Sequence, residues 1–154
     1  MILFAPTTAS VLVRVPASGG VPVPVTQLTS GHNSHRWPQF LPDGRKFLFL
    51  STHGSSGEPS VWMGTLEGRR VKQVIQEDTP GIFAAPDRLL FVRQATLYSM
   101  KFDASEGVVS GEPTPVLHPI GFDDNLSRSA LSVSENGVLA HRALIAERRQ
   151  LAWV

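Results

Sequence analysis

Five histidines are the residues of this sequence that could build a metal centre, and two of them are close in the chain. His32 and His35 lie three positions apart in a polar segment, but a zinc ion needs three or four converging ligands. The chain has no cysteine, so His53, His118 or His141 and a carboxylate would have to complete the site. We therefore predict no metal site. The simpler interpretation is a polar connection in which a histidine hydrogen-bonds to the backbone at the start of a strand.

A serine nucleophile would need an activating base and a strained turn of the Gly-x-Ser-x-Gly type. The nearest match, Gly-Ser-Ser-Gly at residues 54–57, is typical of a flexible hairpin loop between two strands. The sequence also lacks the glycine-rich loop, the His-Arg-Asp loop and the Asp-Phe-Gly site of a protein kinase. We predict that this chain is not an enzyme and has no catalytic residues.

Two charged clusters are candidate binding sites. The Asp-Asp-Asn run at residues 123–125 offers oxygen ligands for calcium, but without the spacing of a calcium loop it predicts a solvated turn. Arg142, Arg148 and Arg149 form a small basic cluster with little aromatic interleaving, which indicates a hairpin surface rather than a phosphate or nucleic-acid site. No cofactor is predicted.

Composition narrows the partners further. The chain has 154 residues, 42% of them hydrophobic, and its 14 basic and 13 acidic residues give a net charge of +1. This balance supports a packed core and provides no field to attract nucleic acid or an anionic membrane. Residues 1–5 are apolar but too short, and without a basic region, for a signal peptide or a membrane span. The compartment therefore stays open.

The elements that must position any site are short strands. Thirteen glycines and twelve prolines divide the chain into short segments, which leaves little room for helices and predicts an all-β fold. Residues 140–150 could be helical by composition, but their apolar spacing favours strand, loop, strand. Turns with Gly, Asn or Asp separate the runs. The predicted strands at apolar runs are residues 2–5, 11–15, 21–25, 47–50, 61–66, 71–75 and 89–92.

A repeat of about 40 to 45 residues, the length of a four-stranded propeller blade, organises these strands. The segment WPQFLPDGRKFLFL at residues 37–50 gives strand, turn and strand, and IFAAPDRLLFV at 82–92 and SALSVSENGVLA at 129–140 repeat it. A third strand and then a fourth follow the first two copies. The fourth strand at residues 113–117 contains two prolines, which suit only a sheet edge.

The segment FLPDGRKFLF at residues 40–49 resembles the core of the TolB-type, WD-like β-propeller repeat. The segments at residues 87–92, 111–113 and 122–140 are similar to segments of propellers attached to bacterial eukaryotic-type serine/threonine kinases. The resemblance covers nearly the whole chain. It departs from the repeat at residues 85–88, which lack the expected glycine, and at residues 134–137, which lack the proline. It implies a fold and says little about function.

Together these patterns predict an all-β segment of a β-propeller with about 3.5 four-stranded blades. The expected blades are residues 1–28 (partial), 35–76, 81–118 and 129–154 (partial). Trp37, Trp62, Trp153 and the phenylalanines are expected to fill the layers between blades, unless some of them line the funnel and stack on a ligand.

The predicted function is a non-catalytic interaction or scaffolding module that binds a peptide, protein or carbohydrate in its funnel. The alternatives are a sensor or regulatory domain of a bacterial receptor-type serine/threonine kinase, and a propeller that gates a hydrolase. For a parent of the receptor-kinase kind the expected compartment of this segment is the periplasm or the cell exterior, while this chain by itself leaves the localisation unknown. The incomplete blades predict unpaired edges at residues 2–5 and 151–154 and a homodimer that closes the ring, with Leu3, Phe4, Leu151 and Trp153 near the seam. The rival is a longer protein whose own blades close it.

Overall fold

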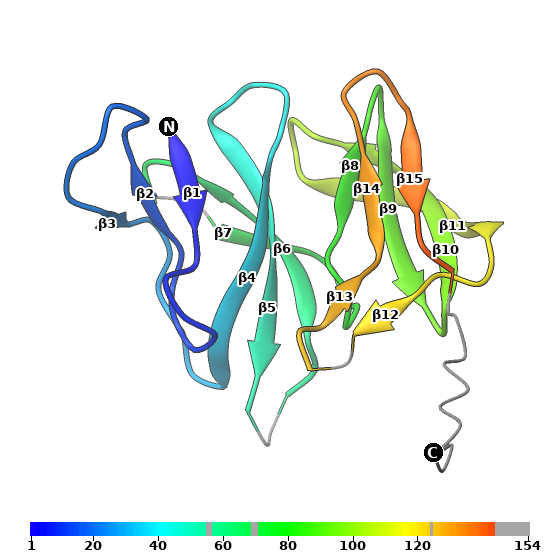
Figure 1. Ribbon diagram of the computed structural model, residues 1–154, viewed down its shortest axis with the longest axis horizontal. Coiled ribbons are helices and arrows are strands. Elements are labelled where there is room, and N and C mark those ends of the chain that lie inside the picture. Colours follow the sequence, from blue (N-terminus) through cyan, green and yellow to red (C-terminus); the bar gives the residue numbers. More distant parts are fainter. Residues whose placement is uncertain (55–56, 69–70, 124, 144–154) are drawn as a thin grey trace, which may run out of the picture.

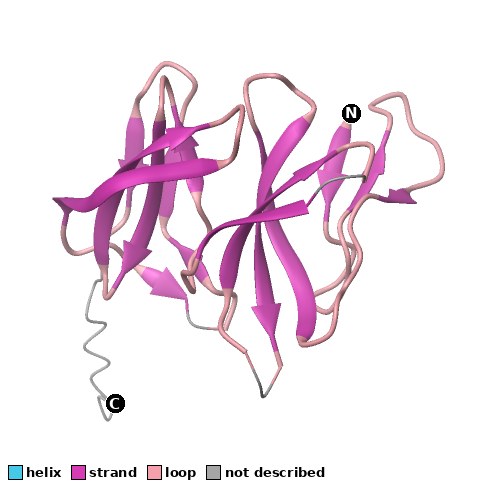
Figure 2. Ribbon diagram, turned by 180° about the vertical axis from the view of Figure 1, so that it is seen from behind, coloured by secondary structure: helices cyan, strands magenta, loops and turns pink. Residues whose placement is uncertain are grey.

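The computed structural model describes residues 1–54, 57–68, 71–123 and 125–143, and within them the chain is built from strands and loops alone (Figure 2). This confirms the predicted all-β class. The physical reason is the spacing of glycine and proline, which interrupts the apolar runs before a helix of ordinary length could form. Since these described residues contain no helix, none of them forms a helix able to cross a membrane.

Two four-stranded antiparallel sheets form the centre of the molecule, and each follows chain order from one edge to the other. Counted along the chain they are the second and third sheets. The second sheet consists of β4 (His32–Phe40), β5 (Lys46–His53), β6 (Ser60–Thr65) and β7 (Val71–Ile75); the third consists of β8 (Ile82–Ala84), β9 (Arg88–Arg93), β10 (Thr96–Asp103) and β11 (Val108–Leu117). The edge strands are therefore β4 and β7 in the second sheet, and β8 and β11 in the third.

Smaller sheets lie on either side of this pair. The first sheet precedes β4 in sequence. Figure 1 shows the first, second and third sheets side by side, with β14 and β15 next to the third sheet. The strands of the first sheet are β1 (Ile2–Phe4), β2 (Val13–Val15) and β3 (Val23–Pro24). The remaining strands pair as β12 (Phe122–Asp123) with β13 (Arg128–Ser129), and β14 (Leu131–Val133) with β15 (Leu139–His141).

Apolar side chains fill the spaces between neighbouring sheets. Because successive side chains of a strand point to opposite faces, β5 contributes Phe47 and Phe49 to one cluster and Leu48 to another. The first cluster also contains Leu12 and Val25 from the N-terminal part of the chain, and joins the first sheet to the second. The other joins the second sheet to the third through buried residues, namely Leu41, Leu48, Val61, Met63, Phe83, Leu89 and Phe102. A third cluster links β9 and β10 to β14 and β15.

The segment between β7 and β8 is fixed to the third sheet by polar contacts. The hydroxyl of Thr79 donates a hydrogen bond to the Val92 carbonyl and accepts one from the Val92 N–H, at 2.9 and 3.0 Å. Next to it the buried carboxylate of Glu77 pairs with the guanidinium of Arg93. These contacts fix the path from one sheet to the next.

Turn and edge chemistry agree with the sequence. Gly44 and Gly68 have φ of 62° and 68°, the left-handed region that glycine adopts without steric cost, at turns predicted from the sequence. Pro113 and Pro115 lie in β11, an edge strand that begins earlier than predicted, at Val108. The segment at residues 140–150 was predicted to be strand, loop and strand. Its first two residues belong to β15, and those from 144 onward lie outside the described residues. Leu151 and Trp153 lie outside them as well.

Candidate functional site: the cleft along the inner strands

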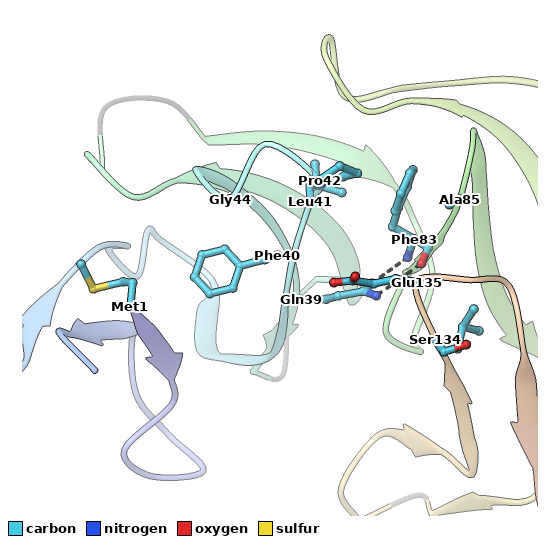
Figure 3. Close-up of a pocket in the computed structure, with 11 residues that line it drawn as sticks. Met1, Gln39, Phe40, Leu41, Pro42, Gly44, Phe83, Ala85, Ser134 and Glu135 are labelled. Atoms are coloured by element: carbon cyan, nitrogen blue, oxygen red, sulfur yellow. Dashed lines mark hydrogen bonds between the residues drawn. The ribbon is translucent and has the colours of Figure 1, made fainter. Parts of the chain in front are cut away.

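Three edge strands, β4, β8 and β14, border adjoining hollows that share lining residues and that we together call the inner-strand cleft. Its wider part, about 820 Å³, is lined by Met1, by Gln39 and the turn after β4, by Phe83 and by the turn after β14 (Figure 3). A narrower part of about 200 Å³ continues past Gln39 and Val133 to Trp37 and Arg128. A third part of about 480 Å³ lies beyond Trp37, between β1 and β4. Apolar walls with a few polar groups are typical of ligand sites.

Gln39 joins two walls of the cleft. Its side-chain oxygen accepts a hydrogen bond from the Phe83 N–H at 2.7 Å, and its amide nitrogen donates to the Phe83 carbonyl at 3.3 Å (Figure 3). A single side chain therefore satisfies both main-chain groups of one residue on the free edge of β8. This contact holds β4 beside β8 and shows that this edge binds an amide group.

Trp37 is placed in the cleft by an irregularity in β4. The pairing of β4 with β5 shifts register between Arg36 and Gln39, and Trp37 has φ of 54° although it is not glycine. A bulky residue costs about 1–3 kcal/mol in that region, and the following Pro38 disfavours helical conformations before it. Bulges of this kind re-aim side chains next to functional sites.

The indole ring of Trp37 is fixed by two contacts from the β12–β13 hairpin. Its Nε1–H donates to the carbonyl of Leu126 at 2.9 Å, and the Cζ atom of Arg128 lies 4.8 Å from the ring centroid. The ring borders both the 200 Å³ and the 480 Å³ parts of the cleft. A fixed aromatic ring beside a cation and backbone carbonyls can stack on a flat or apolar group of a ligand. Trp37 therefore packs against the β12–β13 hairpin and also borders the cleft, which is the alternative that the sequence left open for some of the aromatic residues.

The histidines form a buried polar network between the first and second sheets. His35 is 2% exposed, and its Nδ1 lies 2.8 Å from Thr26 Oγ1, which also accepts the Leu12 N–H at 2.9 Å. Its Nε2 lies 3.3 Å from Nδ1 of His32, which in turn lies 2.8 Å from Ser51 Oγ. The expected hydrogen bond from a histidine to the backbone is wrong, since these rings bind side chains.

Burial and the neighbouring rings keep His35 and His32 neutral near pH 7. Burial, followed by the neighbouring rings of His32 and His53, lowers the pKa of His35 to about 4. Burial and then His53 also lower the pKa of His32. The ring centroids of His32 and His53 are 4.5 Å apart, so a proton on one ring would repel a proton on the other.

Ser51 Oγ and His32 Nδ1 are as close as a nucleophile and its general base, but Ser51 is not accessible to a substrate. Ser51 is fully buried, so a substrate cannot reach its hydroxyl. Nδ1 of His53, the third ring, is buried without a hydrogen-bond partner among the described residues. The geometry therefore serves the interface between sheets rather than nucleophilic chemistry.

The other candidate residues are dispersed. Exposed His118 contacts Thr96 at 3.1 Å, and His141 is exposed on β15. Across the described part of the chain no group of three or more His, Asp or Glu residues is placed to hold a metal ion. Asp123 is exposed, and its carboxylate accepts the N–H groups of Asn125 and Leu126, as in a capped turn. Residue 124 and the arginines at 148 and 149 lie outside the described residues.

Sequence reasoning missed Gln39 and Arg128. Trp37-Pro38 carried a weak signal, since a residue before proline in a strand is a place for a bulge or an edge. Gln39 and Arg128 carried none, because their roles depend on contacts with residues 44 and 91 positions away in the chain. Comparison with protein-family models, curated proteins and solved structures finds no match to this chain.

Proposed function

We propose that this chain is a non-catalytic binding module, a segment of a β-propeller whose inner-strand cleft holds an extended ligand. The propeller architecture draws support from the two four-stranded sheets, which have the same strand order and pack face to face through apolar clusters. Their first strands, β4 and β8, both border the cleft. Radial repetition of such sheets is the propeller arrangement.

The observation that carries the binding proposal is Trp37. Its backbone conformation is unfavourable and its ring is fixed at the junction of two parts of the cleft, although a tryptophan packed between sheets would need neither. Strain of this kind persists where the surroundings require one side-chain position. Stacking of an apolar or flat ligand group on the ring gives that position a purpose.

The test is to screen the purified chain against a peptide library and a glycan array, and to compare Trp37→Ala with Trp37→Phe. We expect the wild-type chain to retain one class of ligand, Trp37→Ala to lose it, and Trp37→Phe to keep part of it because a ring remains. The exposed β11 variant Val116→Ala is the matched control for folding and background. Absence of any ligand at millimolar concentration, or equal binding by Trp37→Ala, would overturn the proposal.

A further inference from the structure

Among the described residues, Arg128 is held at the narrow part of the inner-strand cleft without an oxygen partner for its donors. Its guanidinium lies over the ring of Trp37, with Cζ 4.8 Å from the ring centroid, and the ring offers no oxygen acceptor. A guanidinium carries five N–H donors. Within the described ranges none of these donors binds a protein oxygen, and no carboxylate lies within 4 Å of it. Arg36, also beside Trp37, instead donates to Thr8 and Ser34.

Positive and negative side chains lie at different places along the cleft. Arg128 borders the 200 Å³ part and an adjoining hollow of about 470 Å³, which Arg142 also lines. Asp123 is the acidic residue described there, and its Oδ1 already accepts two backbone N–H groups. Glu135 lines the opposite, wide end of the cleft. A ligand lying along the cleft is therefore attracted most strongly with its negative group at Arg128.

The edge of β14 that faces the cleft favours a peptide as the ligand. Gln39 already occupies both the N–H and the carbonyl of Phe83 on β8, so a peptide main chain would add to β14 instead. β14 borders both the 820 Å³ and the 200 Å³ parts of the cleft through Val133. A carboxylate matches the fork of donors on an arginine better than any neutral group.

We propose that the inner-strand cleft binds an extended peptide whose side-chain carboxylate, from Asp or Glu, is held by Arg128 over Trp37. This inference rests on the proposed binding function. It adds the class of ligand and the residue that selects it. Charge-assisted hydrogen bonds contribute about 1.5–3 kcal/mol, so the acidic ligand should bind at least about tenfold more tightly than its neutral analogue.

The probes are two amidated hexapeptide libraries that are identical except that Asp at every third position is replaced by Asn. Binding is followed by NMR through the Nε1–H signal of Trp37, assigned by its loss in Trp37→Phe, and through the Nε–H signal of Arg128. We expect the acidic library to shift both signals at concentrations about tenfold lower than the neutral one. Arg128→Gln should remove the difference between the two libraries, while Lys101→Gln, the same charge change on exposed β10, should keep that difference.

The outcomes separate this inference from the function on which it rests. Equal binding of both libraries, or a preference that survives Arg128→Gln, would overturn the carboxylate site and leave the binding function standing. Binding of an acidic oligosaccharide such as oligogalacturonate, with no response to either peptide library, would overturn the peptide assignment. No response to peptides, glycans or oligogalacturonate would overturn both proposals.

Discussion

The buried histidine network predicts that the protein loses stability on mild acidification. His35 has a pKa of about 4 in the folded protein and an ordinary value of 6.5 when exposed, so the unfolded chain takes up the proton first. A base with a lowered folded pKa destabilises the fold as the pH falls through 6.5, and the loss levels off below about 4. The pKa of His32 is lowered as well and acts in the same direction.

The size of the effect follows from the two pKa values of His35. Each pH unit between 6.5 and 4 removes about 1.4 kcal/mol from the free energy of unfolding, so the whole window removes roughly 3 kcal/mol. Asp43 and Asp103 have pKa values lowered below 3.8, because backbone N–H groups and neighbouring side chains bind their charged forms. Their stabilising contribution disappears only at still lower pH, which leaves pH 6.5 to 4.5 as the window of the histidines.

Urea unfolding followed by tryptophan fluorescence, at half-unit steps from pH 7.5 to 4.5, measures this loss. His35→Gln should flatten the profile, because the amide can still bind Thr26 but cannot take up a proton. His141→Gln, on the exposed strand β15, is the control and should leave the slope unchanged. If the wild-type stability changes by less than about 0.5 kcal/mol over the window, or if His35→Gln retains the wild-type slope, the reasoning fails.

Three further predictions concern packing and assembly. Gly64→Ala should lower the free energy of unfolding by about 1–3 kcal/mol, because its methyl would lie 2.8 Å from the Phe47 ring, and Gly54→Ala, where nothing lies within 4 Å, should be neutral in the same urea titration. Glu77→Gln should cost about 1–2 kcal/mol and lower the calorimetric Tm, because the buried carboxylate loses its ionic pairing. We also expect self-association through the open edge of β1, so Ile2→Lys should shift the light-scattering mass from dimer to monomer; a wild-type chain that is monomeric at micromolar concentration would contradict this.

Local patterns predicted what local interactions determine. The turn at Gly44 and the edge position of Pro113 follow from backbone sterics within a few residues, and both are found where the sequence placed them. The continuous apolar run around Phe47 predicted a buried strand, and β5 is indeed buried on both of its faces.

The site depended on contacts that no local pattern records. Trp37 is typical of a packing residue, because the following Pro38 is only a weak signal for the register shift that turns the ring into the cleft. Thr26 gave no sign that it would partner His35, since Thr26 lies in the loop after β3 and His35 in β4. Histidine and serine are residue types of metal and triad chemistry, which the sequence pattern did not predict, and the burial of Ser51 prevents access to its hydroxyl.

The contacts that shape the cleft join residues far apart in the chain, and this has a kinetic consequence. Hairpins such as β5–β6 close over a few residues, whereas Gln39 meets Phe83 across 44 positions and Trp37 meets Leu126 across 89. Contacts of large sequence separation pay the greatest loop-closure entropy and form late in folding. The same contacts should open in partial excursions that leave the individual sheets intact, and amide exchange at Phe83 would report those excursions. We therefore expect the cleft to be the last part of the molecule to form and the first to open, which early protection of the Phe83 amide during folding would contradict.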